Sequence, residues 1–458
     1  MRWFLGIAGI LVVSLVLQAG LVAFAGYVLL GVFATSRYLA RNWIESLSAT
    51  VECNAEPCEI GSEVEVVVTV SNSGKLLIPW VLAEHFIPEI TMRHRRLKLD
   101  GKHLRVLVLR AGGEQRIKYR VTFLRRGYYQ FGPLFLETGD VFGLHRRHRV
   151  LTQPAFVLVY PKVLPLASFD FRSQRPIGEV RLANRLFEDP TRSAGVRPYQ
   201  LGDPLQRVHW RATARTGQLH SKIYEPTTLA GATLLLDFHQ DGYPSRGEPQ
   251  RSDLAVTTAA SLAYAVAALN QQIGFVSNGR DATDRIREEA VLKEQTAKLE
   301  AADYATRNQA REHFEEKPDA HRLKPVTVDT RRGYDQFGQI RETLARLELT
   351  DGLSFASLIF EVAPRLPKDA TVIALLPTVS VETSVALGQL RRQGFAISVL
   401  LIGLGQDGND ARVVAHGRLA AEGIRDVRFL NTETDLLALG DRSAMAIPTE
   451  YAVSASLA

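Results

Sequence analysis

The sequence predicts a multi-domain protein with an N-terminal transmembrane helical hairpin, a β-sandwich-like domain and a doubly wound α/β domain. Three observations lead to this fold class. Residues 3–34 contain no charged residue, Val- and Thr-rich segments separated by turns fill residues 47–160, and short apolar runs alternate with helical segments over residues 231–440. Such an alternation is typical of a parallel sheet covered by helices.

Composition limits the function classes. The chain has 458 residues, with 55 Lys and Arg against 49 Asp and Glu, and therefore a net charge of +6. This charge is small for the length, and we expect no nucleic-acid partner because nucleic-acid binders concentrate far more positive charge on one face. The two cysteines, Cys53 and Cys58, are too few for a disulfide scaffold or a four-cysteine zinc site. We expect no cofactor.

The first part, residues 1–36, is the expected membrane segment. Its uncharged run exceeds the roughly 20 residues of one upright span, and Gln18–Gly20 near its middle predicts a tight hairpin. One long tilted helix is the alternative. A cleaved signal peptide is less favoured because its apolar core is shorter. The flanking Arg2, Arg37 and Arg41 place the soluble domains in the cytoplasm.

Residues 47–160 form the expected β-rich domain. The segment Glu63–Ser71 alternates partly and is rich in Val and Thr, which suits a half-buried strand. Similar segments are separated by glycine-containing turns, a pattern typical of a β-sandwich. The further predicted strands are 104–109, 117–123 and 128–136.

Residues 231–440 form the expected α/β domain, followed by a C-terminal tail at 441–458. The apolar runs are short, as in strands buried on both faces. Ser252 and Asp253 are plausible caps for the first long helix. A charged helical insertion at 281–324 interrupts the pattern, either as a solvated excursion or as a partner-docking arm. The predicted strands are 232–238, 273–276, 371–376 and 395–402, and the predicted helices are 252–270 and 381–393.

The intervening segment, residues 161–230, contains the most informative string. Asp203 is a natural N-cap and Pro204 suits the first helical position, so we expect a helix from there that stops at Gly217. On this helix Arg207, Arg211 and Arg215 have i, i+4, i+8 spacing and form one stripe of mutually repelling charges.

Such a stripe needs acidic partners or an anionic ligand. One interpretation is an internal ion-pair lattice with Asp203, Glu188, Asp189 or Glu225, in which Trp210 packs beneath the helix. The other is a surface that binds a protein carboxylate or a phosphate. His209 has a suggestive setting, but no serine or cysteine nucleophile is indicated beside it, and we expect no enzymatic activity.

Three strings together resemble the Domain-of-Unknown-Function 58 family (DUF58). They are Arg197–Glu225 (RPYQLGDPLQRVHWRATARTGQLHSKIYE), Arg125–Leu144 (RRGYYQFGPLFLETGDVFGL) and Tyr160–Val163 (YPKV). The resemblance implies a bacterial inner-membrane protein with a hairpin anchor, a β-rich domain and a von Willebrand factor A-like domain. It also implies an adaptor or scaffold that works with a MoxR-type AAA+ ATPase and a transglutaminase-like membrane protein. The expected partner-binding residues are Arg197, Tyr199, Gly202, Asp203, Arg207, His209, Trp210, Arg211 and Arg215.

The resemblance raises the question of a metal site. A von Willebrand factor A domain often holds Mg²⁺ through D-x-S-x-S after its first strand, with further ligands from later loops. Here Asp237 is followed by His239 and Asp241 in place of both serines, Thr350-Asp351 is a possible second element, and Pro377-Thr378 stands where an aspartate is expected. We therefore expect no metal, and a strand-end cap or ion pair for Asp237.

Two other functions remain open. One is an enzyme acting on an anionic envelope substrate, with His209 and either Asp203 or Asp237 as acid–base groups. The other is a metal-dependent adhesion module.

Overall fold

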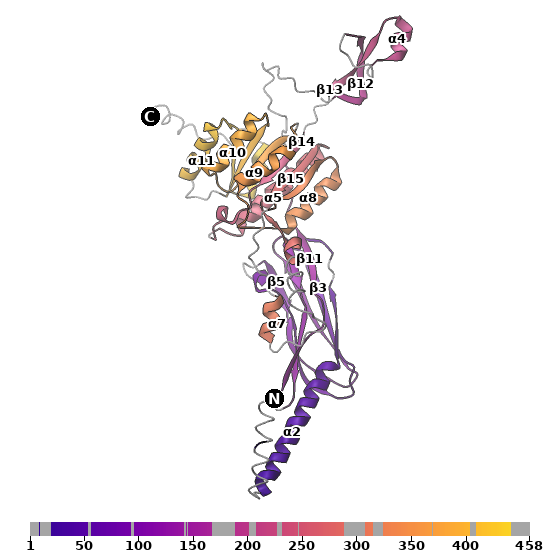
Figure 1. Ribbon diagram of the computed structural model, residues 1–458, viewed down its shortest axis with the longest axis vertical. Coiled ribbons are helices and arrows are strands. Elements are labelled where there is room, and N and C mark those ends of the chain that lie inside the picture. Colours follow the sequence, from indigo (N-terminus) through magenta and orange to yellow (C-terminus); the bar gives the residue numbers. More distant parts are fainter. Residues whose placement is uncertain are drawn as a thin grey trace. The chain divides into compact units, whose positions relative to one another are not determined.

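The computed structural model describes most of the chain as two compact units (Figure 1). Unit 1 contains residues 1–162, 280–321 and 342–348, and unit 2 contains residues 163–279, 322–341 and 349–458. Almost all of the charged segment that the sequence assigns to the α/β domain thus belongs to unit 1. The residues described are 9, 20–53, 56–92, 96–141, 143, 145–166, 188–200, 208–226, 231–245, 247–287, 307–314, 324–368, 370–403 and 409–440.

Unit 1 is built around β-sheets that enclose one apolar core, as the sequence predicts. The predicted strand at 128–136 is in fact two strands, separated at Gly132-Pro133. The first sheet has the order β1 (Leu47–Cys53), β3 (Glu63–Asn72), β7 (Glu114–Phe123), β5 (Leu97–Gly101). The second has the order β10 (Arg146–Val150), β9 (Leu134–Gly139), β4 (Ile78–His85), β6 (Leu104–Leu109), and the third β2 (Cys58–Glu59), β11 (Ala155–Tyr160), β8 (Gly127–Phe131).

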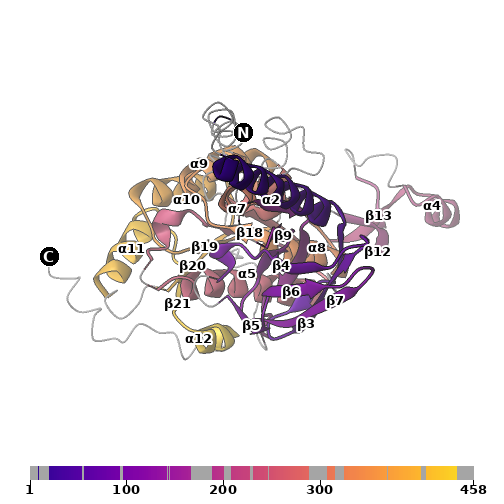
Figure 2. The same ribbon diagram turned by 90° about the horizontal axis from the view of Figure 1, so that it is seen from below.

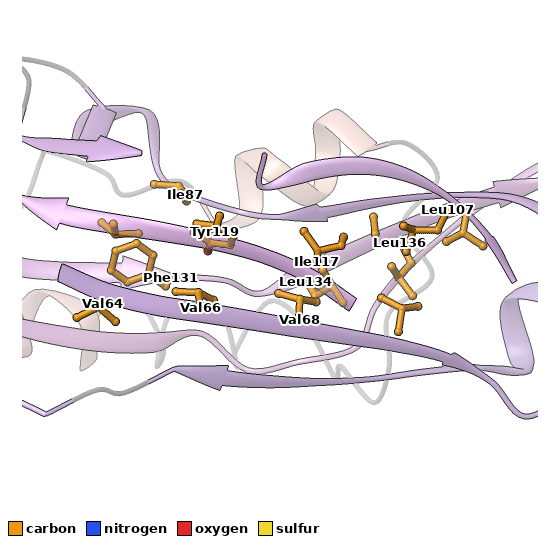
Figure 3. Packing of buried hydrophobic residues seen from close by; sticks show 14 of the residues in the cluster. Val64, Val66, Val68, Ile87, Leu107, Ile117, Tyr119, Phe131, Leu134 and Leu136 are labelled. Carbon is orange, nitrogen blue, oxygen red and sulfur yellow. The ribbon is translucent and has the colours of Figure 1, made fainter. Parts of the chain in front are cut away.

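The core of unit 1 follows from strand periodicity. On β3, Val64, Val66, Val68 and Val70 are buried, and the residues between them are more exposed. Figure 3 shows Val64, Val66 and Val68 in one cluster with side chains of β7 and β9, among them Ile117. Burial of each such side chain contributes about 1.5–3 kcal/mol, and a slip by one residue would expose the whole row. The register of β3 is therefore strongly fixed.

Helix α2 (Gly20–Glu45) precedes the sheets, and it is the one helix in the described part of the chain that is long and apolar enough to span a membrane. The first half of the predicted hairpin lies outside the described residues, except for Gly9, and the hairpin stays a prediction. Towards its C-terminal end α2 buries Ala40, Trp43 and Ile44. The Arg149 guanidinium on β10 donates a 3.2 Å hydrogen bond to the Ile44 carbonyl oxygen. This end of the helix is therefore part of the folded unit (Figures 1 and 2).

A short helix from the charged segment, α7 (Arg307–Phe314), packs on the same unit. The Arg307 guanidinium donates a 2.6 Å hydrogen bond to the buried Glu84 carboxylate, and the Phe314 and Phe135 rings lie 5.8 Å apart. Unit 1 also contains α3 (Glu89–Met92) and the ladder of β16 (Arg280–Asp281) with β18 (Leu347–Glu348).

Unit 2 contains an open six-stranded sheet in which all strands except β17 run parallel. Numbered along the chain, the strands have the order 3-2-1-4-5-6, which reverses between β14 and β19; this is the doubly wound arrangement. In sheet order they are β17 (Val326–Arg331), β15 (Gln272–Ser277), β14 (Gly231–Leu236), β19 (Thr371–Leu376), β20 (Ile397–Ile402) and β21 (Val427–Leu430).

Helices cover both faces of this sheet. One face packs against α9 (Phe355–Val362), α10 (Val381–Arg392) and α11 (Asn409–Ala421) in one apolar cluster. The other packs against α5 (Gln250–Ala268), beside α8 (Tyr334–Arg346), where the Tyr264 and Phe337 rings lie 5.4 Å apart. Helix α12 (Glu433–Leu437) follows β21. The predicted caps Ser252 and Asp253 are wrong because α5 begins earlier, after Pro249.

Candidate partner-binding surface

The signature segment forms a hairpin with a short helix inside it. Strands β12 (Glu188–Pro198) and β13 (His220–Pro226) pair antiparallel, and α4 (Trp210–Thr216) lies between them in the chain. The predicted helix start at Pro204 is corrected: Val208 bridges to Ser221, and the helix begins only at Trp210. Gly202, Asp203 and Arg207 lie outside the described residues, so the stripe is seen only at Arg211 and Arg215.

Both ends of α4 are capped. The His209 ring Nδ1 accepts a 2.9 Å hydrogen bond from the Ala212 N–H, which satisfies one of the free donors at the helix start. This bond puts the proton of the neutral ring on Nε2. At the other end Gly217 adopts φ 72°, and its N–H donates to the Thr213 carbonyl oxygen. A residue at this position must adopt the left-handed conformation, which glycine does without steric cost.

Hydrogen bonds also hold α4 to β13. The His209 N–H donates to the His220 carbonyl oxygen at 2.8 Å, and the His220 N–H donates to the Thr213 hydroxyl at 3.1 Å. A seven-residue helix is not stable alone in water. These bonds and the caps therefore preorganise α4, although the helix buries no side chain of its own.

The outer surface of α4 is apolar and cationic. The Trp210 side chain is 68% exposed, so the expectation that it packs beneath the helix is wrong. Arg211 and Arg215 are exposed, and within the described part of the chain neither has a carboxylate partner. The side chains of Glu188, Asp189 and Glu225 lie outside that part. An exposed indole beside exposed guanidinium groups is the composition typical of protein-binding hot spots.

The other predicted residues lie at the adjoining end of the hairpin. Arg197 pairs with Ser221 across the β12–β13 ladder, and its guanidinium donates to the Pro198 carbonyl oxygen at 3.2 Å. The Tyr199 N–H donates to the Leu219 carbonyl oxygen at 2.9 Å. The hairpin thus brings Arg197, Tyr199 and α4 into one segment. We call the exposed Trp210, Arg211 and Arg215 the α4 surface.

A second location follows from the sheet of unit 2, at the carboxyl ends of its strands where the order reverses. Asp237 follows β14, and its Oδ1 accepts hydrogen bonds from the His239 N–H at 3.2 Å and the Asn278 amide at 2.9 Å. Burial raises the pKa of Asp237, and the bonds from Asn278 and His239 oppose that effect. Asp237 thus acts as a strand-end cap that orders the loop after β14.

The residues at this edge do not fit a magnesium ion. One oxygen of Asp237 already accepts two N–H groups, and the serine positions are His239 and Asp241. The Pro377 carbonyl oxygen accepts a hydrogen bond from the Arg251 guanidinium, a cation where a second carboxylate would be required. Thr350 does lie beside His239 through a backbone bridge. Among the described residues, no three His, Cys, Asp or Glu side chains are grouped to hold a metal.

Sequence reasoning did not identify two residues that organise this edge. The buried Asn278 amide oxygen accepts from the Phe238 N–H at 2.6 Å, and its nitrogen donates to Asp237 and to the Leu353 carbonyl oxygen. Arg251 also donates to the Ile402 carbonyl oxygen at 3.1 Å. The position of Asn278 directly after a buried strand was an available signal, since the carboxyl ends of parallel strands meet at one edge.

Comparisons with known proteins give a family match and a distant relative. Residues 195–322 match the family described as “Protein of unknown function DUF58”. This range contains α4, β13 and only the last residues of β12. The “Uncharacterized protein YeaD” of Bacillus subtilis (strain 168) is 24% identical over 268 residues. That match covers 58% of this chain and 64% of the relative. Neither description names an activity.

Solved structures offer only partial likenesses. The CARDB domain of the PF1109 protein from Pyrococcus furiosus is 14% identical, with coverage of 25% of this chain and 86% of that chain and a TM-score of 0.16. The PapD-like domain 7 of human CEP192 is 11% identical, with coverage of 24% and 83% and a TM-score of 0.17. Scores this low carry no argument about fold or function.

Proposed function

We propose that this protein is a membrane-anchored, non-enzymatic adaptor that binds a partner protein through the α4 surface. The observation that carries the proposal is the exposure of Trp210 on a helix held in place at both ends. Large aromatic and arginine side chains dominate binding energy when a partner buries them, and a preformed helix lowers the entropic cost of binding. The partner must present an apolar pocket beside carboxylates.

The finer assignments belong to the same proposal. The resemblance of the signature segment suggests a MoxR-type AAA+ ATPase as partner and a transglutaminase-like membrane protein as a further component, in envelope assembly or maturation at the inner membrane. The doubly wound sheet of unit 2 supports a von Willebrand factor A-like domain that works without a metal. The long apolar helix α2 supports anchoring, with both units in the cytoplasm.

The test is direct binding. Full-length protein in detergent is immobilised, and the affinity of the purified MoxR-type ATPase from the same organism is measured. Trp210→Ala should weaken binding about thirtyfold, because truncation of a central aromatic typically costs 2 kcal/mol or more. Arg211→Glu with Arg215→Glu should weaken it at least as much, since both charges then repel the partner's carboxylates.

Unit 2 provides matched controls. Phe360, 56% exposed on α9, and the exposed Arg365 just after that helix offer the same two kinds of side chain elsewhere. Phe360→Ala and Arg365→Glu should leave the affinity unchanged. Equal affinity of wild type and the α4 variants, with all proteins folded by circular dichroism, would refute the proposal.

A further inference from the structure

Unit 1 contains an apolar cavity where α2 meets the turn between β9 and β10. Its volume is about 290 Å³, far more than the roughly 10–15 Å³ that one water molecule requires. The lining is almost entirely apolar, and it consists of Val28, Gly31, Val32, Thr35, Ser36 and Leu39 from α2 with Asp140 and Val141 from the turn.

Two of the three polar side chains in the lining, Ser36 and Asp140, already have partners. The Ser36 hydroxyl lies 2.8 Å from the His145 ring Nδ1, and the Asp140 carboxylate accepts a 2.6 Å hydrogen bond from the His145 N–H. The Phe33 ring packs edge-on against the same histidine, with centroids 4.5 Å apart. The cavity therefore has little to offer a polar ligand, whereas an apolar chain would bury its surface there.

The position of the cavity along α2 indicates that lipid acyl chains are the apolar chains next to it. The cavity is lined by residues of α2 between Val28 and Leu39, and Arg37 is the first charged residue after the uncharged run. Leu21 and Phe24, nearer the helix start, are 87% and 68% exposed, as expected of side chains that face lipid. If α2 is anchored as proposed above, the cavity lies at the boundary between acyl chains and headgroups.

Positive charge borders the same place. Arg37 is exposed on α2, and Arg147 is partly exposed on β10. Burial lowers the pKa of His145, and the guanidinium groups of Arg37 and Arg147 lower it further, against the opposing effect of Asp140. Arg37 directly follows Ser36, which lines the cavity, and Arg147 lies two residues after His145, whose ring contacts Ser36. A phosphate there would gain two charge-assisted contacts.

We infer that this cavity holds an acyl chain of an anionic membrane phospholipid whose headgroup phosphate contacts Arg37 and Arg147. The inference rests on the proposed anchoring of α2 but not on the proposed partner. The exposed Val141, opposite α2, would enter the same interfacial layer, and the β9–β10 turn would thus become a second, non-spanning contact of unit 1 with the bilayer.

The test uses full-length protein in vesicles that contain phosphatidylglycerol with a photoactivatable acyl chain. Labelled peptides are identified by mass spectrometry. Lipid should label the turn at Asp140–Val141 as well as α2. Gly31→Leu should reduce labelling of the turn severalfold, because a Cβ at Gly31 meets no atom within 4 Å and the larger side chain can fill the cavity. Gly20→Leu, equally free of contacts on the same helix but outside the cavity, should not.

Charge is tested separately. Arg37→Gln and Arg147→Gln should each lower the preference for phosphatidylglycerol over phosphatidylcholine by about fivefold.

Vesicle flotation reports anchoring independently. Failure to float would refute both the anchoring and the lipid site. Three outcomes would refute the lipid site alone in protein that does float. They are a turn that is not labelled, equal labelling of the turn in Gly31→Leu and wild type, and cross-links that show residues 1–19 in the cavity.

Discussion

At the scale of single residues, the largest shift in histidine pKa among the described residues is that of His85 in unit 1. The His85 ring Nδ1 lies 2.5 Å from the Tyr119 hydroxyl, and both side chains are buried. Burial lowers the pKa of His85 to about 4, with a smaller contribution from His103, and burial raises the pKa of Tyr119. Both groups are therefore neutral at pH 7, and protonation of His85 opposes folding.

This perturbation predicts acid destabilisation of unit 1. The unfolded chain takes up the His85 proton near pH 6.5, but the folded chain does so only near pH 4. The stabilising contribution is thus complete above pH 6.5 and is lost as the pH falls to about 4, a change of roughly 3 kcal/mol. Urea unfolding of the full-length protein in detergent at several pH values should show this loss, and His85→Gln should flatten the slope. Parallel pH profiles of the two proteins would contradict the assignment.

At the scale of elements, α4 shows how a helix without a core face is maintained. Its stability comes from the His209 cap, the Gly217 stop and hydrogen bonds to β13. If His209 is only a cap, the side chain needs to supply an acceptor and nothing else. If it were an acid–base group, its titration would matter, and asparagine could not replace it.

Two substitutions separate these roles. His209→Ala should cost α4 about 1 kcal/mol and speed amide hydrogen exchange over residues 210–216 about fivefold. His209→Asn should keep exchange and partner affinity near wild type, because asparagine is a good N-cap. Equal loss of a measured function in both variants, with exchange restored in His209→Asn, would favour the acid–base interpretation.

An element was predicted well where its own residues determine it, and poorly where a contact with another part of the chain does. The strand at 371–376 was predicted to the residue because a short apolar run between turn signals indicates a buried strand without information from other parts of the chain. The helix start was misplaced because Val208 is held by Ser221, a partner distant in sequence, and because histidine is an unusual N-cap.

Of the predicted site, Arg211 and Arg215 were correctly placed on a helix, but the exposure of Trp210 depends on packing that periodicity does not encode. The roles of Asn278 and Arg251 depend on which strand ends meet.

At the scale of the whole molecule, the charge asymmetry around α2 predicts orientation. Arg37 and Arg41 follow the apolar run, and basic residues beside a span remain on the cytoplasmic side. Protease added to inverted membrane vesicles should therefore digest both units, and protease added to right-side-out vesicles should leave them intact. Arg37→Glu with Arg41→Glu should increase the protected fraction in inverted vesicles. Digestion from the outside in wild type would reverse the proposed topology.

The division of the chain between the units has a consequence for biosynthesis. Unit 1 draws on residues 280–321 and 342–348 in addition to the first 162, and unit 2 is assembled from the segments between and after them. Domains usually fold in the order in which they leave the ribosome. Here unit 1 can be complete only after residue 348 has been translated, because α7, which supplies the arginine that binds Glu84, comes from residues 307–314. Truncation at residue 162 would leave unit 1 incomplete. A chaperone that binds this incomplete unit during translation would cover the surface on which α7 later packs.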